Sequence, residues 1–195
     1  SLDVTLGYLY NNRREFEEHH HHDEEEEEEE EHDDHEILEP ALHMKLKTFS
    51  YNVKYNLPKL GRFETIVGIQ GINQSNTNYG EELLIPNATT NDFGVLAVSH
   101  IHFKTLDIQL GTRYDHRKIT IKNNDNRNFN AFNGALGFKT NLLEKVTARL
   151  NLASGFRAPN LAELASNGTH EGTNRYEIGN LDLKNEQNFN DLCLE

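Results

Sequence analysis

The sequence predicts an all-β protein: an antiparallel up-and-down transmembrane β-barrel segment, about eight strands of a larger barrel, with long extracellular loops. Three observations predict this class. Apolar and polar residues alternate with period two in one segment after another, as in strands with a single apolar face. The connections between these segments alternate between long and short. No apolar run reaches the about 18 residues that a transmembrane helix needs.

The clearest alternation lies in residues 106–115, where the two faces separate completely. One face has Leu106, Ile108, Leu110, Thr112 and Tyr114, and the other has Asp107, Gln109, Gly111, Arg113 and Asp115. The strands predicted by this pattern cover residues 2–12, 51–57, 62–72, 93–103, 106–115, 132–139, 146–153 and 186–195. Most of these segments reach the about 9–11 residues with which a tilted strand crosses a bilayer.

The connections favour a membrane barrel over a soluble sandwich. Short turns are predicted at 58–61, 104–105 and 141–145, a medium connection at 122–130, and long ones at 13–41, 73–92 and 157–185. Tight turns at one end and long loops at the other are typical of outer-membrane barrels. The apolar face would then meet lipid and the polar face an aqueous lumen. Five tyrosines fit interfacial aromatic girdles, although cross-strand packing explains them too: Tyr8, Tyr10, Tyr51, Tyr55 and Tyr114.

One tract dominates the charge of the chain. Between Glu15 and Glu39 lie sixteen acidic residues and no Lys or Arg, whereas the whole chain has a net charge of −13. Six of the eleven histidines stand in the same tract, which reads HHHHDEEEEEEEEHDDH from His19 to His35. So charged a segment is predicted to be solvated and mobile. Imidazole and carboxylate together are ligands that zinc accepts; the alternative is a solvated acidic loop that binds nothing specific.

Residues 153–195 read ASGFRAPNLAELASNGTHEGTNRYEIGNLDLKNEQNFNDLCLE. They resemble the barrel of TonB-dependent outer-membrane receptors, in which a GFRAP-N-like phrase ends a strand, a long extracellular loop follows, and an E-Q-S-x-N-x-E/D-like phrase begins the return strand. Ser154–Leu164 match the first phrase and Glu186–Asp191 the second, with Phe189 in place of a small or polar residue. The intervening Ser166–Asn180 and the phrase Leu83–Asn87 look like the members of this family associated with zinc and other metals.

The resemblance implies a function for a larger protein. Receptors of this kind have a plug domain with a TonB box that engages the energising inner-membrane TonB complex, and further strands beyond the motif. None of these is recognisable in residues 1–195, which are expected to be a partial barrel domain, with residues 13–41 and 157–185 as extracellular loops. The expected location is the outer membrane of a Gram-negative bacterium, in contact with its lipid.

The expected ligand is a metal ion or metal complex, with zinc as the first candidate, as cargo and not as a catalytic cofactor. Candidate ligands form two groups, the acidic tract and the tip of the family-like loop: His19, His20, His21, His22, Asp23, His32, Asp33, Asp34, His35, His170 and Glu171. For His170 the alternative is a hydrogen bond to the backbone. His100 and His102 share a strand face. They are expected to line the lumen, and the alternative is that they chelate a metal ion. Arg157 and Arg175 are expected to pair with Glu163, Glu171 or Glu177 and order the loop.

Other function classes find little support. The chain has no phosphate-binding Gly-rich loop, no HExxH and no GxSxG, so no enzyme is predicted. The acidic balance disfavours nucleic acid as a partner. Two alternatives stay open beside active import: a passive porin-like or adhesive barrel whose acidic loop attracts metal, and a soluble secreted β-protein that buffers metal.

Overall fold

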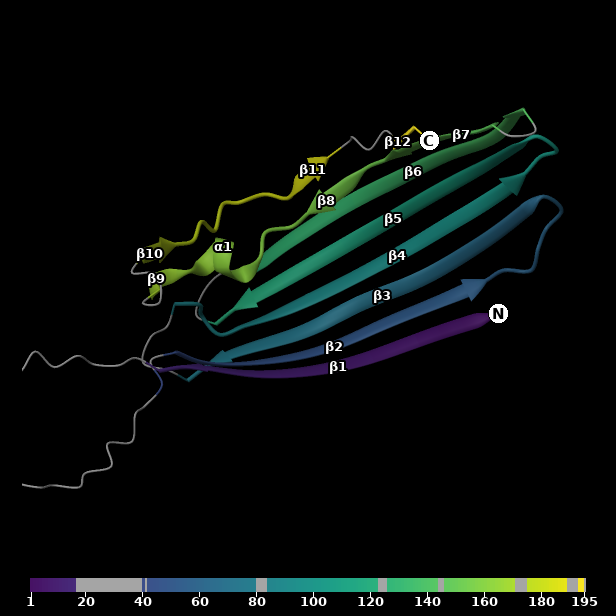
Figure 1. The fold of residues 1–195 in the computed structure, drawn as a ribbon. Helices are drawn as coiled ribbons and strands as arrows, with labels where there is room; N and C mark the ends of the chain where they lie inside the picture. Colours follow the sequence, from purple (N-terminus) through teal and green to yellow (C-terminus); the bar gives the residue numbers. More distant parts are fainter. Residues whose placement is uncertain are drawn as a thin grey trace, which may run out of the picture.

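A computed structural model describes residues 1–16, 40, 42–79, 84–122, 126–143, 146–170, 175–188 and 193–194. Its main element is one curved antiparallel sheet in which every strand pairs with its neighbour in sequence up to β7, and β12 then pairs with β7 (Figure 1). In sheet order the strands are β1 (Leu2–Glu15), β2 (Leu42–Asn56), β3 (Phe63–Asn78), β4 (Ala88–His102), β5 (Leu106–Ile121), β6 (Arg127–Leu143), β7 (Val146–Ala153) and β12 (Cys193–Leu194). The predicted up-and-down all-β class is confirmed.

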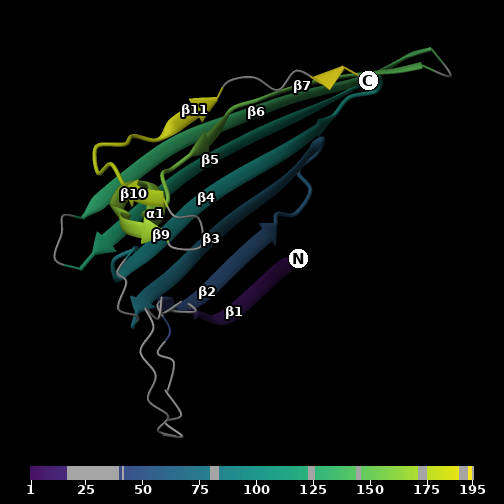
Figure 2. The same cartoon turned by 60° about the vertical axis from the view of Figure 1, so that its left-hand side comes forward.

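A smaller layer follows β7 in the chain. It contains β8 (Gly155–Arg157), which pairs with β11 (Glu186–Asn188), and β9 (Asn167–His170), which pairs with β10 (Arg175–Ile178). A short helix, α1 (Leu161–Ala165), lies between β8 and β9. Figures 1 and 2 both show α1, β9 and β10 over one face of the main sheet, near the end where β4 begins, and β8 and β11 farther along it, beside β6.

Strand ends that long and short connections join lie at opposite ends of the sheet. The ends that face each other across the β2–β3, β4–β5 and β6–β7 junctions, which few residues separate in sequence, lie at one end, which we call the turn end. The ends at the β1–β2, β3–β4 and β5–β6 junctions lie at the other, the loop end. This separation is what an up-and-down barrel requires, and it confirms the asymmetry predicted from the sequence.

The strands are longer than the sequence pattern predicts. The loop expected at residues 73–92 is reduced to 79–87, because β3 continues to Asn78 and β4 starts at Ala88. The β3 extension consists of Asn, Gln, Ser and Thr, and the β4 extension of Ala88, Thr, Asn and Asp92, so no apolar alternation marks them as strand. The ladder of backbone hydrogen bonds nevertheless continues through them, with Asn76 opposite Ala88. By contrast, the final strand expected at 186–195 is divided into two short strands, β11 and β12.

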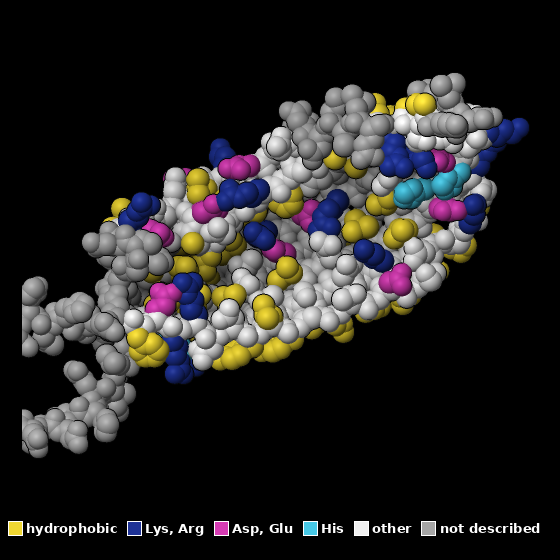
Figure 3. All heavy atoms as spheres, viewed as in Figure 1, with side chains coloured by type: hydrophobic (Ala, Val, Ile, Leu, Met, Phe, Trp, Pro, Cys, Tyr) yellow, Lys and Arg dark blue, Asp and Glu magenta, His cyan; other side chains and the backbone are white. Residues whose placement is uncertain are grey.

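The two faces of the sheet have opposite chemistry. On the convex face, apolar and aromatic side chains are exposed, among them Leu2, Val4, Leu6, Tyr8, Phe49, Tyr55, Val67, Ile69, Phe93, Val95, Leu110, Tyr114 and Phe132. The concave face is hollowed and has charged and polar side chains interspersed with apolar ones (Figure 3). An apolar outside and a polar inside are the reverse of a soluble β-sandwich and the arrangement of a barrel wall in lipid.

The apolar band ends along a sloping line. From β1 to β6 the first polar residues beyond the last apolar side chain on the convex face, counted toward the loop end, are Asn12, Lys47, Asn73, Asn91, His116 and Asn130. In the hydrogen-bonded register, Asn12 stands six residues beyond the row that joins Leu6 on β1 to Asn130 on β6. Lys47 stands four residues beyond that row, Asn73 and Asn91 two, and His116 lies in it.

This slope matches the tilt of strands in a membrane barrel. Six residues are about 20 Å along a strand and five strand spacings about 24 Å across the sheet, which gives a tilt of about 40°. Barrel strands tilt by about 35–45°. With this tilt the edge of the apolar band becomes level with the membrane plane. The band itself runs from Phe93 to Ile101 on β4, which corresponds to a height of about 20 Å, close to the about 25 Å of outer-membrane barrels.

The buried apolar core lies on the concave face beneath the smaller layer. Leu164 of α1 and Ile119 of β5 are each 1% exposed. With them cluster Ala88, Ile121, Phe129 and Ala158, and Phe156, Leu161, Leu181 and Leu183 pack against the cluster. The segment from Ala158 to Leu183 is therefore anchored inside the mouth at the loop end, on β4, β5 and β6.

Candidate functional site

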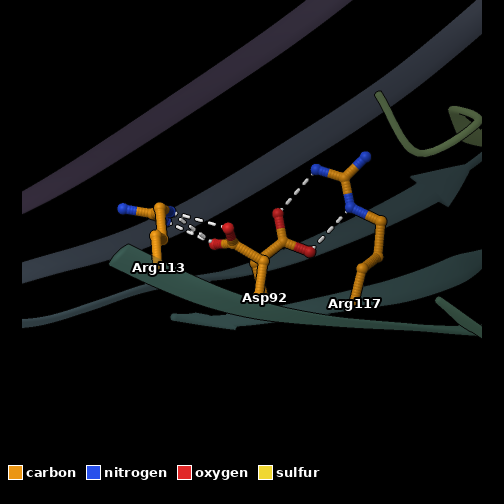
Figure 4. A network of polar contacts seen from close by, with 4 residues as sticks. Asp92, Arg113 and Arg117 are labelled. Atoms are coloured by element: carbon orange, nitrogen blue, oxygen red, sulfur yellow. Dashed lines mark hydrogen bonds and ion pairs between the residues drawn. The ribbon is translucent and has the colours of Figure 1, made fainter. Parts of the chain in front are cut away.

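Two Arg–Asp pairs lie side by side on the concave face (Figure 4). Arg117 of β5 donates from Nε and Nη2 to the carboxylate of Asp92, directly opposite on β4, at 2.7 and 2.6 Å. Arg113 donates from Nε to both carboxylate oxygens of Asp115, two residues along the same strand, at 2.8 and 2.7 Å. Hydrogen bonds between two charged groups hold a guanidinium in a fixed orientation, so these side chains form a preorganised polar surface.

Both carboxylates are largely withdrawn from solvent. The side chain of Asp115 is 12% exposed and that of Asp92 is 22% exposed, and each has an arginine that is 29% exposed. Gly94 stands opposite Asp115 in the register, and a Cβ there would lie 2.6 Å from Asp115 Oδ1 and 2.7 Å from Arg113 Nη2. The glycine thus leaves the space that the Arg113–Asp115 pair occupies.

An open cavity of about 520 Å³ adjoins the pairs. The polar groups that line it come from β2, β3, β4 and β5 and from the smaller layer: Asn52, Gln70, Asp92, Arg113, Arg117 and Arg157. Amide, guanidinium and carboxylate groups offer hydrogen bonds of both senses and paired charges. The cavity is suited to receive a polar ligand or a polar segment of protein from the aqueous side.

The roof of the site is ordered by α1. Asn160 Oδ1 accepts a hydrogen bond from the N–H of Glu163 at 2.8 Å, and Glu163 Oε2 accepts one from the N–H of Asn160 at 2.9 Å. This capping box fixes the start of the helix. Arg157 also donates to Glu163 and lies 3.6 Å from Glu186, which confirms the pairing predicted for Arg157. The hydrogen bond from Asn160, with a further contribution from Arg157, lowers the pKa of Glu163 below its usual value.

The histidines of β4 lie at the turn end of the same face. The rings of His100 and His102 stack with their centroids 6.4 Å apart. Nδ1 of His102 is 2.8 Å from Asp107 Oδ1, and its Nε2 is 3.5 Å from Glu64 Oε2. A cavity of about 380 Å³ lies beside them, with Lys139 and Arg149 in its wall. The interpretation as lumen lining fits, because the two ring nitrogens of His102 already face carboxylates.

Most of the predicted metal ligands lie outside the described residues. These are His19, His20, His21, His22, Asp23, His32, Asp33, Asp34, His35 and Glu171. His170 ends β9 opposite Arg175, and its side chain is likewise outside what is described. Within the described ranges, no group of three or more His, Cys, Asp or Glu residues is arranged to hold a metal ion. The metal prediction therefore stays a prediction.

The paired charges on the concave face were not singled out from the sequence. Alternation in residues 106–115 does place Arg113 and Asp115 on one face, and their spacing of two was the available signal. The partnership of Asp92 with Arg117 depends on the β4–β5 register, which the sequence pattern does not specify.

Comparison with family models identifies the family of the chain. The family model described as TonB dependent receptor-like, β-barrel, matches residues 5–190 of the 195. No curated protein matches the chain. In the described part of the chain, no helix is long and apolar enough to cross a membrane.

Proposed function

The chain belongs to the TonB-dependent receptor β-barrel family, and from that premise we propose that it forms the barrel wall of a receptor that imports a metal ion or metal complex, with zinc as the first candidate. Barrels of this family lie in the outer membrane and serve ligand import that depends on TonB. The family is one of transporters, so binding and passage are the expected chemistry, and not the making or breaking of bonds.

The proposal depends above all on the tract from His19 to His35. Strand β1 ends at Glu15 and β2 begins at Leu42, and these two residues are direct partners at the loop end. Both ends of the tract are thereby tied to the mouth of the barrel. Six imidazoles and many carboxylates near one opening raise the local concentration of divalent cations and offer exchangeable zinc ligands.

The concave face suits the step after capture. Its two Arg–Asp pairs are internally neutral, so the path from the loop end has polar groups without a strong net field of either sign. A hydrated metal ion or a metal complex released from the tract would then make exchangeable hydrogen bonds, and no strong opposite charge would hold it there. Capture and passage would be separate tasks, performed by the tract and by the lumen surface.

Deletion of residues 19–35 tests this proposal. Cells with the deletion should accumulate less zinc than wild-type cells when zinc is scarce and the same amount when it is abundant. The measurement is mass-spectrometric accumulation of zinc, nickel, copper and iron with and without the gene. Equal accumulation of all four metals in cells with and without the gene would exclude metal import.

Two controls separate the contributions. Replacing the six histidines of the tract by Gln keeps its acidic charge. A loss of zinc accumulation equal to that of the deletion would assign capture to imidazole. Full retention of zinc accumulation would assign capture to the carboxylates. Removal of TonB distinguishes active import from a passive pore: accumulation at scarce zinc should fall to the level without the receptor, and accumulation that persists would favour the porin-like alternative.

A further inference from the structure

Negative charge on the long strands is confined to one face. Six carboxylates occur in the described residues of β1 to β7, and the register places all of them on the concave face: Asp3, Glu15, Glu64, Asp92, Asp107 and Asp115. The convex face of the same strands has no acidic residue within the described ranges. It does have four cations, namely Arg14, Lys45, Lys47 and Lys118.

These four cations follow the edge of the apolar band. Lys47 is itself the first polar residue beyond the band on β2, and Lys45 is the next convex residue outward. Arg14 and Lys118 are likewise the second polar positions on β1 and β5. All four therefore lie within two residues, or about 7 Å along the strand, of the sloping edge that becomes level in the membrane.

The surroundings of these four cations are suited to an anion from outside the protein. Arg14, Lys47 and Lys118 are exposed, and none of the four cations forms an ion pair with a described residue. Lys45 stands 4.3 Å above the ring of Tyr79. Between the cations the convex row continues with hydrogen-bonding side chains such as Asn73, Ser75 and Asn91. Unpaired cations beside a lipid-facing band meet the zone in which lipid phosphates lie.

We propose that this cationic row, Arg14, Lys45, Lys47 and Lys118, binds the phosphate groups of lipids in the outer leaflet and thereby holds a ring of phosphorylated lipid around the mouth of the barrel. The acidic tract is another anion near β1 and β2. Lys118, however, stands on β5, three strands from β2, and the row follows the bilayer edge and not the base of that loop. The proposal rests on the outer-membrane placement and is independent of which ligand the receptor imports.

The test uses the protein extracted from its native outer membrane and two lipid probes, bisphosphorylated lipid A and the same lipid without phosphates. Native mass spectrometry counts the lipid that each sample retains. Wild-type protein should bind the phosphorylated probe much more strongly than the dephosphorylated one. In the variant R14Q/K47Q/K118Q, affinity for the phosphorylated probe should fall about fivefold for each cation, hence about a hundredfold in all.

A matched control variant removes three exposed cations from the concave face. Arg13→Gln, Lys54→Gln and Lys139→Gln change the net charge equally and include the immediate neighbour of Arg14. This control should bind the phosphorylated probe as wild type does. Equal loss in the two variants, or equal binding of both probes by wild-type protein, would overturn the proposal.

A deletion of the acidic tract provides the last test. Deleting residues 19–35 should preserve or increase lipid binding, because it removes a competing anion. A fall to the level of the convex variant would show that the tract and not the row holds the lipid. The probe comparison on unaltered protein decides the matter even where a variant fails to assemble.

Discussion

At the scale of single residues, the space left by Gly94 determines where two charged side chains can lie. The Arg113–Asp115 pair occupies the volume that a side chain at this position would take. Both partners sit on the same face of β5, so they can meet only if the facing position on β4 is empty. The glycine is therefore required by the polar surface of the lumen and not by a turn.

We expect Gly94→Ala to destabilise the barrel by about 1–3 kcal/mol, because the new methyl group must displace Asp115 or Arg113. Gly134→Ala on β6 is the matched control, since its Cβ would find no atom closer than 3.9 Å. The measurement is the temperature at which each variant loses the fast mobility of a folded barrel on a cold denaturing gel. A midpoint lowered equally by the two substitutions would contradict the role assigned to Gly94.

Glu163 makes the roof of the site dependent on pH. Its pKa is lowered in the folded protein, so its contribution is fully present above the ordinary glutamate pKa and is lost as the pH falls through the lower, folded value. Hydrogen exchange of the amides of α1 should therefore become faster relative to the strands as the solution is acidified below the ordinary glutamate pKa.

Two substitutions at Glu163 separate its two contacts. Glu163→Gln keeps an acceptor for the N–H of Asn160 but loses the charge that faces Arg157, so protection of α1 should be nearly as high at neutral pH and no longer fall in acid. Glu163→Ala should lose protection at every pH. A pH dependence that survives in Glu163→Gln would assign the effect to another group.

At the scale of elements, the segment from Ala158 to Leu183 is held to the sheet by an apolar contact. Leu164 packs with Ile119 and Phe129 on the concave face. This apolar contact is what anchors a long loop inside the barrel mouth. The loop is thus a folded roof over the cavity.

Leu164→Ala should weaken this anchor by about 2–5 kcal/mol, since the side chain is almost fully buried. Hydrogen-exchange mass spectrometry should show lost protection in residues 158–168 and 175–183 with β4 to β6 unchanged. Leu152→Ala is the control, because Leu152 is 44% exposed and faces away from the concave side. Loss of protection spread equally over the sheet would show that the roof and sheet unfold as one unit.

The elements show how far the sequence alone could predict this structure. Alternation in residues 106–115 and 132–139 correctly assigns each residue to a face, because lipid and water impose opposite chemistry on neighbouring positions. The polar strand ends, such as Asn73–Asn78, have water on both faces, so the pattern that marks a strand disappears there. Ile119, Ile121 and Phe129 stand on the concave face, opposite to the apolar face of residues 106–115 and 132–139, and their burial depends on a loop more than thirty residues later in the chain.

For the candidate site the sequence was a weaker guide. Composition alone makes the tract His19–His35 conspicuous, and its role in metal capture awaits measurement. The Arg117–Asp92 pair joins residues 25 positions apart, and only the register of β4 against β5 brings them together. Long-range pairs of this kind follow from the three-dimensional arrangement and leave no local signature.

At the scale of the whole molecule, three properties of the sheet agree on how it lies in the membrane. The apolar band is on the convex face, its edge slopes by the tilt of a barrel, and the strand carboxylates are turned to the concave side. The band and its edge depend on the apolar residues of the convex face, and the third property depends on a separate set, the carboxylates, so two independent sets of residues agree. The convex face is the lipid surface of the barrel, and the concave face is its lumen.

A pair of adjacent substitutions tests this orientation directly. Leu110 lies near the middle of the apolar band on β5, and Gln109 beside it faces the lumen; both are exposed in the isolated sheet. Leu110→Arg should destabilise the barrel by about 2–4 kcal/mol, because the charge is placed near the bilayer midplane, whereas Gln109→Arg should be tolerated in water. Assembly in the outer membrane, followed by the fraction of folded protein on a cold denaturing gel, should fall for the first variant only. The reverse result would mean that water, and not hydrocarbon, bathes the convex face, and the barrel assignment would fail with it.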